Sequence, residues 1–477
     1  MALFRTGDSP FLRIRVLAFA ALVPIAAAWS STASHDVDAR SATAFGERQL
    51  PGLAITVLRG DEVLFAKGYG RVDTARGGTV DGATVFQLGS ISKQFLAVLV
   101  LSLAEEERLS LDDSVLDHLP DHAQLPPGLT VRHLLNHTSG LRELLTVPEA
   151  HAGFDDLTRS RAELVALVRQ LPVDFPPGTR WSYSNTNYTL LALIVEQVTR
   201  EPYEDALAER FFRPLQLSSM RQCLSRPRPP ADAVGHEWHE GGNVEAAAEN
   251  MNWIRGDGGL CGSAIDVARW TRLLATGRVV PAAVYEGMTA PTQLLGGSLA
   301  EYGFGLSLVD LEGRQRVGHN GAMRGFSATA AYYPDAAITI VVLANRGDVR
   351  TESIERPIAR QLLGLPEARV REAPLSPEQR HRYLGEYDIG IFDVQVLERD
   401  GQLWLEMPRP GPTTSLTHLG NHTFAGDADP DAYSVTFDGT DGAAQSLRLL
   451  MGGMRWHGLR SVGDEPVATP EDDSRTR

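Results

Sequence analysis

The amino-acid sequence predicts an α+β fold, in which an antiparallel sheet is flanked by helices, followed by a small all-β domain. Three observations support this prediction: hairpin patterns stand at both ends of the region up to residue 350, helical segments lie between them, and the periodicity changes after a proline-rich stretch. The chain has 477 residues and 43% hydrophobic content, which is enough for two or three domains with a sizeable core.

Two hairpins define the predicted sheet. Residues 53–58 and 62–66 alternate as strands around a Gly-Asp turn, and residues 328–333 and 338–344 form a similar pair around a Pro-Asp turn. Because the hairpins stand at opposite ends of the region with helices between them, we expect their strands to share one antiparallel sheet.

A long apolar segment over residues 91–108 predicts a buried helix with Ser90 at its N-terminus. Lys93 follows three residues later, so the hydroxyl and the amine share one helix face. Only Lys67 and Lys93 of the 45 basic residues are lysines. Since a buried lysine can lose its proton and an arginine cannot, Lys93 is a candidate base. A Ser-x-x-Lys pattern alone is weak evidence, so other motifs must support it.

The C-terminal part has a different pattern. Residues 366–377 are rich in proline and predict a linker, with a helix start at its end. Residues 378–466 alternate apolar and polar positions between turn signals, which predicts a small all-β domain of the barrel or half-barrel kind. The polar residues 467–477 are expected to be a disordered tail.

The N-terminus has the layout of a secretory signal peptide, which we assign to residues 1–33. Arginines precede an apolar run over residues 16–28, and small residues follow it. The run is too short to span a bilayer comfortably, so an uncleaved anchor is the less favoured alternative. We therefore expect a periplasmic or secreted protein without stable membrane insertion after signal removal.

Charge and cysteine content narrow the partners and the compartment. The formal net charge of -15 disfavours nucleic acid and anionic membranes, which need basic patches, and leaves a small-molecule or peptide substrate. The two cysteines, Cys223 and Cys261, could form one disulfide in an oxidising compartment or remain separate buried thiols.

Further motifs support the Ser-x-x-Lys pattern. Residues 175–185, FPPGTRWSYSN, contain a Tyr-x-Asn element made by Tyr183 and Asn185, and residues 318–321 read Gly-His-Asn-Gly. The first resembles the Tyr-x-Asn element of class C β-lactamases and their esterase and peptidase relatives. The second resembles the His-x-Gly variant of that family's Lys-Thr-Gly strand.

Two further segments, residues 134–141 and 258–263, also match the family and stand in the right order. The chain is thus similar to the serine β-lactamase-like, penicillin-binding family of peptidase S12 type over about residues 45–350. The resemblance implies a catalytic domain over residues 34–365 that includes an all-helical subdomain. The all-β part, residues 378–466, is similar to the lipocalin-like domain appended to some relatives.

The resemblance also implies roles for individual residues. Ser90 is the expected nucleophile, and its backbone N–H together with that of Ala322 would form an oxyanion hole. Lys93 and the phenol of Tyr183 would share the base and acid work, once burial or a neighbouring cation lowers their pKa values. Asn185 would hydrogen-bond Lys93 and the substrate amide.

The third motif contributes His319, Asn320 and Gly321 to the expected substrate-binding strand. His319 stands where the family has a lysine, and its imidazole can orient Tyr183 through a hydrogen bond. It offers less permanent charge to a substrate carboxylate, which argues against efficient β-lactam turnover. Arg324 could restore an anion partner, although a solvated arginine is the favoured interpretation.

The leading hypothesis is an acyl-enzyme hydrolase that acts on a small ester or amide, with D-amino-acid peptides among the candidates. The alternatives are a β-lactamase and a catalytically idle penicillin-binding or scaffold protein. No cofactor and no metal is expected. His133 and His137 have metal-ligand spacing but lie in a structural segment of the family, and the acidic and histidine cluster at residues 236–240 precedes glycines that mark a loop.

Overall fold

The computed structural model of the protein describes residues 23–461 except 123, 227, 409, 410, 412, 428, 440 and 441. Its centre is a six-stranded sheet in the order β11-β12-β13-β1-β2-β3, in which every neighbouring pair is antiparallel. The strands are β11 (Val317–Met323), β12 (Phe326–Tyr333), β13 (Ile338–Ala344), β1 (Gly52–Arg59), β2 (Glu62–Asp73) and β3 (Gly77–Thr79). Both expected hairpins form, and β1 pairs with β13 to join them into one sheet, as predicted.

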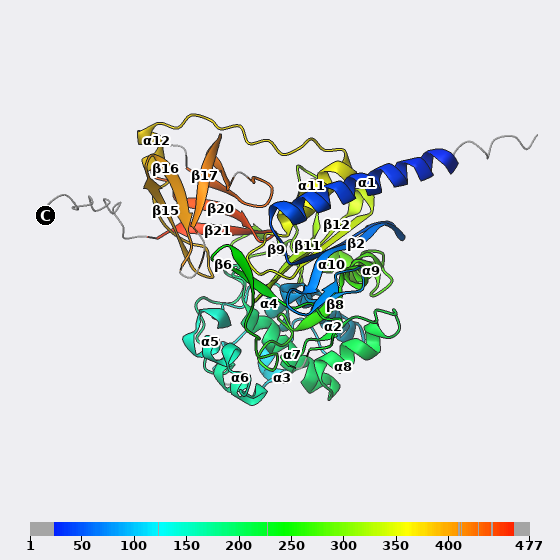
Figure 1. The fold of residues 1–477 in the computed structure, drawn as a ribbon. Coiled ribbons are helices and arrows are strands. Elements are labelled where there is room, and N and C mark those ends of the chain that lie inside the picture. The colour runs from blue at the N-terminus through cyan, green and yellow to red at the C-terminus, as the bar shows by residue number, and fades with distance from the viewer. Residues whose placement is uncertain are drawn as a thin grey trace, which may run out of the picture.

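Helices cover both faces of this sheet because its strands alternate apolar side chains between two cores. Leu53 and Ile55 of β1 pack with α1 (Val23–Glu47) and α11 (Glu352–Leu363), whereas Ala54 and Leu58 point to the opposite core with α9 (Ala264–Ala275). Figure 1 shows α1 and α11 along one side of the molecule. The predicted α+β class is confirmed.

A helical region packs against the core on the α9 side of the sheet and forms the lower part of the molecule in Figure 1. It consists of α2 (Ser92–Glu105), α3 (Val115–His118), α4 (Val131–Leu135), α5 (Pro148–Asp155), α6 (Arg161–Val168), α7 (Asn185–Thr199), α8 (Tyr203–Leu207) and, near α9, α10 (Ala282–Met288). The predicted helix at residues 91–108 is α2, which is mostly apolar after its polar first turn and buried along most of its length. A 3₁₀ turn, η1 (Gly89–Ile91), precedes it and carries Ser90.

Three short strands form a small separate sheet beside the helical region. β8 (Leu260–Ser263) pairs with β4 (Val85–Gln87) and with β5 (Arg221–Gln222), and Cys223 forms a disulfide with Cys261 of β8. The sequence left the disulfide and two free thiols as alternatives, and the structure contains the disulfide. Two small hairpins complete the region: β6 (His236–His239) with β7 (Gly242–Glu245), and β9 (Thr292–Gln293) with β10 (Leu299–Ala300).

The C-terminal part is a closed eight-stranded barrel, which confirms the expected all-β fold. Its strands are β14 (Gly385–Asp388), β15 (Asp393–Arg399), β16 (Gln402–Glu406), β17 (Thr413–Gly420), β18 (Thr423–Gly426), β19 (Ser434–Asp438), β20 (Ser446–Met451) and β21 (Met454–Arg460). An extended connection leads to it from α11 and ends in α12 (Pro377–His381), whose N-cap is Ser376 (Figure 1). The domain boundaries at residues 366–377 remain predictions.

The barrel packs directly against the sheet and the helical region. The ring of Trp456 lies 5.4 Å from that of Trp181 and 6.1 Å from that of Tyr183, measured between centroids. Tyr183 and Tyr302 belong to the same hydrophobic cluster as the barrel interior. Ion pairs surround this contact, namely Arg180–Asp388, Arg350–Asp427 and Arg455–Glu301.

Most of the predicted signal peptide, residues 1–22, lies outside the described residues, and so does the predicted tail, residues 467–477. From Val23 the chain is helical and continues through the expected cleavage region as α1. Within the described residues, no helix is both long and apolar enough to cross a membrane.

Candidate active site

Two glycines allow the turn that carries Ser90 to lie against strand β11. A Cβ atom on Gly321 would be 1.9 Å from the carbonyl oxygen of Leu88, and one on Gly89 would be 2.8 Å from the backbone nitrogen of Ala322. Gly89 also has a φ of 53°, which favours glycine. The backbone amides of Ser90 and Ala322 are thereby brought to the same place, as an oxyanion hole requires.

Lys93 is fully buried behind Ser90. Its Nζ donates to the Ser90 Oγ at 3.2 Å, to the Asn185 Oδ1 at 2.7 Å and to the backbone carbonyl of Asp257 at 2.5 Å. Burial lowers the pKa of Lys93 to about 8, against the opposing charges of Asp257 and Glu143. A substantial share of this amine is therefore neutral near pH 8 and can accept a proton.

Tyr183 lies on the other side of the lysine. The Lys93 Nζ is 4.8 Å from the centroid of its ring, and its phenol oxygen is buried without a hydrogen-bond partner among the described residues. Burial raises the pKa of Tyr183 well above its usual value, and the nearby Ser90 hydroxyl offsets only part of this rise. Tyr183 is thus a neutral phenol at pH 7 and a proton donor rather than a standing base.

Glu143 fixes the orientation of Asn185 and was not among the residues predicted from the sequence. Its Oε1 accepts from the Asn185 Nδ2 at 2.7 Å, and its Oε2 accepts from the backbone N–H of the same residue. These contacts turn the Asn185 Oδ1 toward Lys93. Glu143 lies two residues after the matched segment 134–141, and this proximity is the signal that could have found it.

His319 is buried, and both of its ring nitrogens are engaged. Nδ1 lies 2.5 Å from the carbonyl oxygen of Asn320, so it must carry the proton, and Nε2 accepts from the Tyr302 hydroxyl at 3.0 Å. Burial lowers the pKa of His319 to about 3, so the imidazole is neutral at pH 7. The expected hydrogen bond from His319 to Tyr183 is therefore wrong, because Tyr302 occupies that nitrogen, and the rings of His319 and Tyr183 only pack together.

The other members of the third motif have separate positions. Asn320 lies on the opposite face of β11 from His319, and its Nδ2 donates to the Glu352 Oε2 at 2.8 Å. Gly321 contacts the Ser90 turn, and Ala322 is exposed at the surface of the cavity.

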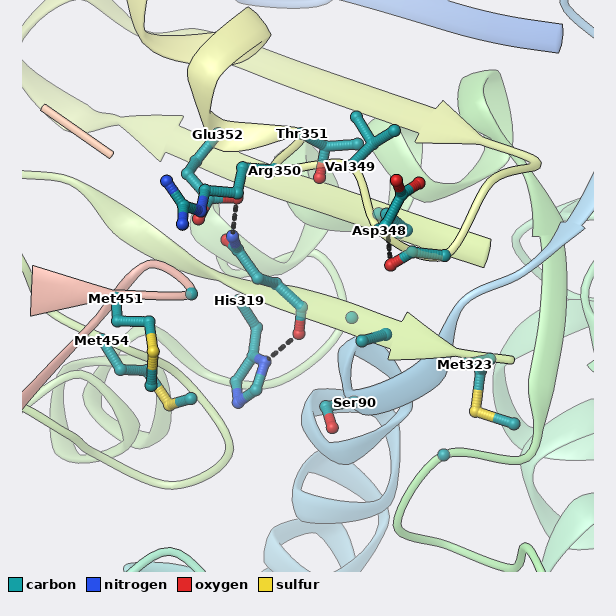
Figure 2. Close-up of a pocket in the computed structure, with 18 of the residues that line it drawn as sticks. Ser90, His319, Met323, Asp348, Val349, Arg350, Thr351, Glu352, Met451 and Met454 are labelled. Atoms are coloured by element: carbon teal, nitrogen blue, oxygen red, sulfur yellow. Dashed lines mark hydrogen bonds between the residues drawn. The ribbon is translucent and has the colours of Figure 1, made fainter. Parts of the chain in front are cut away.

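Ser90 opens into a cavity of about 1090 Å³ between the catalytic region and the barrel. In Figure 2, Met323 lies on one side of Ser90, and Met451 and Met454, from the turn between β20 and β21, lie on the other side beside His319. Further apolar side chains of the cavity wall are Leu145, Phe154, Ile254, Ile391, Phe392, Met407 and Trp456. The barrel therefore contributes part of the wall, which sequence patterns did not predict.

The remaining candidates have structural surroundings. Arg324 forms an ion pair with Asp155 at 2.6 Å, so its charge is already balanced. His133 accepts from the backbone N–H of Thr130 at the start of α4, and His137 packs among aromatic rings beside Tyr183. The cluster at residues 236–240 forms the strand β6 and the start of the tight turn to β7, which includes the first of the glycines expected to mark a loop. Among the described residues, no three potential ligands are arranged to hold a metal.

A comparison with protein-family models matches residues 34–364 to the beta-lactamase family. The chain belongs to this family. The resemblance inferred from the motifs is thereby confirmed.

The curated proteins that are similar in sequence to this beta-lactamase family member include two D-aminopeptidases. That of Gluconobacter oxydans (strain 621H) is 31% identical over 303 residues, which cover 62% of this chain and 56% of the relative. The D-aminopeptidase of Brucella ovis is 30% identical over 336 residues, which cover 69% of this chain and 62% of the relative. The chain thus spans about three fifths of the length of these relatives.

Solved structures give the same fold. The octameric penicillin-binding protein homologue from Pyrococcus abyssi aligns with a TM-score of 0.64 at 23% identity, over 89% of this chain and 99% of its own. A D-stereospecific amidohydrolase from Streptomyces sp. aligns with a TM-score of 0.55 at 27% identity, over 65% of this chain and 93% of its own.

Proposed function

We propose that this protein is a serine hydrolase that forms an acyl-enzyme at Ser90 and hydrolyses small amides or esters, with amides and short peptides of D-amino acids as the favoured substrates. The contact of 3.2 Å between the Lys93 Nζ and the Ser90 Oγ, inside a buried site, carries the proposal. The D-aminopeptidase relatives and the D-stereospecific amidohydrolase support the substrate class.

Acylation follows from the placement of these groups. Neutral Lys93 takes the proton of the Ser90 hydroxyl while Oγ attacks the substrate carbonyl carbon. The negative charge that develops on the carbonyl oxygen is stabilised by the backbone amides of Ser90 and Ala322. The Tyr183 phenol donates a proton to the leaving nitrogen and recovers one from Lys93, so that the amine leaves neutral and the ester to Ser90 remains.

Deacylation reverses these roles with water as the nucleophile. A water molecule that reaches the ester carbonyl loses its proton to Lys93, and the same two amides stabilise the second oxyanion. The Ser90 oxygen is then reprotonated through Lys93 or Tyr183, and the free acid departs. Asn185, oriented by Glu143, keeps the Lys93 amine in line with Ser90 throughout.

Two alternatives are less well supported. A β-lactamase needs a cation for the β-lactam carboxylate, whereas His319 is neutral and Arg324 is paired with Asp155. An idle penicillin-binding or scaffold protein would have no need of a buried lysine in contact with a helix-terminal serine. We accordingly expect p-nitrophenyl esters and D-aminoacyl amides to be hydrolysed faster than a chromogenic cephalosporin.

Covalent labelling tests the nucleophile. A fluorophosphonate probe, or a fluorescent penicillin, is expected to label Ser90, with the adduct located by mass spectrometry. Ser90→Ala should abolish labelling. Ser92→Ala is the matched control: this serine lies two residues away and accepts a hydrogen bond from the backbone N–H of Leu260, away from the cavity. Labelling that persists in Ser90→Ala, or an adduct elsewhere, would contradict the assignment.

We also propose that the protein is exported to the periplasm or beyond. The basic and apolar layout of residues 1–33 supports export, and so does the Cys223–Cys261 disulfide, because such bonds persist in oxidising compartments. Cell fractionation followed by N-terminal sequencing of the purified protein tests both the location and the cleavage position.

A further inference from the structure

The residue that carries this inference is Asp257, which lies next to the nucleophile. Its backbone carbonyl accepts from the Lys93 Nζ at 2.5 Å, and a Cβ on the following Gly258 would be 3.7 Å from the carbonyl carbon of Gly89, the residue before Ser90. Asp257 also lines the cavity into which Ser90 opens. The backbone of Asp257 therefore lies beside the Ser90 turn, and its side chain starts close to where a substrate carbonyl carbon would be held.

The Asp257 carboxylate is buried and only partly satisfied by hydrogen bonds. The side chain is only 7% exposed, and its Oδ1 is buried without a hydrogen-bond partner among the described residues. Lys93 donates to the backbone of Asp257, and no ion pair joins the two side chains within the described residues. Burial raises the pKa of Asp257 to about 7 against the opposing charge of Lys93, so a further cation at this carboxylate would stabilise its charged form.

Several other charged side chains around the cavity already have partners. Arg346 donates to Asp348 at 2.6 Å, Arg350 pairs with Asp427, and Arg324 pairs with Asp155. The carboxylate of Glu249 accepts from the backbone N–H of Arg324 at 3.0 Å. Among the described carboxylates that line the cavity, Asp257 is the one with a buried oxygen, Oδ1, that has no hydrogen-bond partner.

We propose that Asp257 binds the α-ammonium group of the substrate, so that the enzyme selects amides and peptides with a free amino terminus. The α-nitrogen of an amino-acid amide is two bonds, roughly 2.5 Å, from the scissile carbonyl carbon, which matches a carboxylate adjacent to the nucleophile. A charge-assisted hydrogen bond from ammonium to carboxylate is stronger than a neutral one. The inference rests on the proposed function and narrows it to one substrate class.

A bound ammonium has a consequence for the base. It lies beside Lys93, and a second cation there disfavours the protonated form of the lysine. Substrate binding at Asp257 thus increases the neutral fraction of the amine that must accept the Ser90 proton. The alternative role for Asp257, a mere counter-charge for Lys93, would affect every substrate alike.

A matched pair of substrates separates these two roles. We would compare D-phenylalanine p-nitroanilide with 3-phenylpropanoic acid p-nitroanilide, which lacks only the amino group, on the full-length protein. In Asp257→Asn, the ratio of kcat/KM for the first to that for the second should fall on the order of tenfold to hundredfold, chiefly through KM. Asp348→Asn makes the same chemical change in the same cavity at a carboxylate paired with Arg346, and should leave the ratio unchanged.

Several results would overturn the proposal. Asp257→Asn could lower kcat/KM for the two p-nitroanilides by the same factor, which would mean that the carboxylate acts only through Lys93. Alternatively, Glu249→Gln, rather than Asp257→Asn, could lower the ratio of the two kcat/KM values. If Asp257→Asn does not fold, the wild type still provides a test, because N-acetylation of the D-phenylalanine substrate should reduce kcat/KM at least tenfold. Equal or faster hydrolysis of the acetylated substrate would refute ammonium recognition. Labelling of Ser90 does not depend on the amine, so its failure would count against the proposed function instead.

Discussion

Lys93 combines a hydrogen-bonded position with an environment that disfavours its charge. Three acceptors hold its amine, yet burial lowers its pKa to about 8. The other lysine, Lys67, is exposed and forms an ion pair with Asp38 at 2.7 Å. The two lysines of the chain thus represent a base candidate and an ordinary surface cation.

Lys93→Arg is expected to reduce kcat at least about a hundredfold, because arginine keeps the charge but cannot accept the Ser90 proton. Lys67→Arg should retain activity and serves as the control. In the wild type, kcat/KM for a neutral ester should rise as the pH increases through about 8, since the neutral amine is the active form. Ester hydrolysis rates over a pH series measure both effects. An arginine variant with more than a tenth of the wild-type turnover would contradict the role.

The sequence could predict residues that belong to local motifs and could not predict those brought together by folding. Ser90 and Lys93 were found by their spacing, and Tyr183 and Asn185 by the resemblance of their segment to a family motif. Asp257 is 164 residues from Lys93 in the chain, and no pattern links the two. The hydrogen bond from Tyr302 to His319 was missed for the same reason, which led to the wrong partner for the imidazole.

At the scale of elements, the close contact between the Ser90 turn and strand β11 determines whether the backbone amides of Ser90 and Ala322, which we propose as the oxyanion hole, can lie together. Elements with strong local periodicity, such as β1, the β12–β13 hairpin and α2, were predicted within a few residues, whereas β2 continues seven residues beyond its predicted end at residue 66 and ends at Asp73. Helix α1 was not predicted, because its C-terminal half is mostly polar and is held by contacts of Val37 and Ala44 with the sheet core. Such tertiary contacts leave little trace in local periodicity.

Gly321→Ala should separate η1 from β11, because the new Cβ would be 1.9 Å from the Leu88 carbonyl oxygen. Loss of one oxyanion-hole donor costs about a hundredfold or more in kcat, and we expect a loss of that size with secondary structure retained. Gly287→Ala, where a Cβ would meet no atom within 4 Å, is the matched control. Ester hydrolysis and circular dichroism provide the readouts. Near-normal turnover in Gly321→Ala would show that the amides of Ser90 and Ala322 do not act together.

At the scale of the whole molecule, the barrel covers the aromatic side of the site. Trp456 packs on Trp181 and Tyr183, and the turn between β20 and β21 reaches the cavity beside His319 (Figure 2). The six-stranded sheet is nevertheless complete at Ala344, before the connection to the barrel begins. Folding and activity can therefore depend differently on this part of the chain.

A chain that ends at Pro366 is expected to retain a cooperative thermal transition, because both cores of the sheet are formed before that residue. It should lose much of its activity and selectivity, since Tyr183 would lose its cover. Thermal melts and ester hydrolysis by the truncated and full-length proteins test this. A non-cooperative melt would show that the barrel and the catalytic region share one core, and unchanged selectivity would show that the barrel does not shape the cavity.

Four of the eight methionines of the chain, Met323, Met407, Met451 and Met454, line the cavity and are partly exposed, whereas Met220, Met251 and Met288 are buried. Oxidation of exposed thioethers to sulfoxides would turn an apolar wall into a polar one without touching Ser90. Mild peroxide treatment should consequently raise KM for substrates with large apolar groups more than for acetyl esters. Methionine sulfoxide reductases should reverse the effect. In an oxidising compartment, the same wall that favours apolar substrates would make substrate range sensitive to oxidative stress.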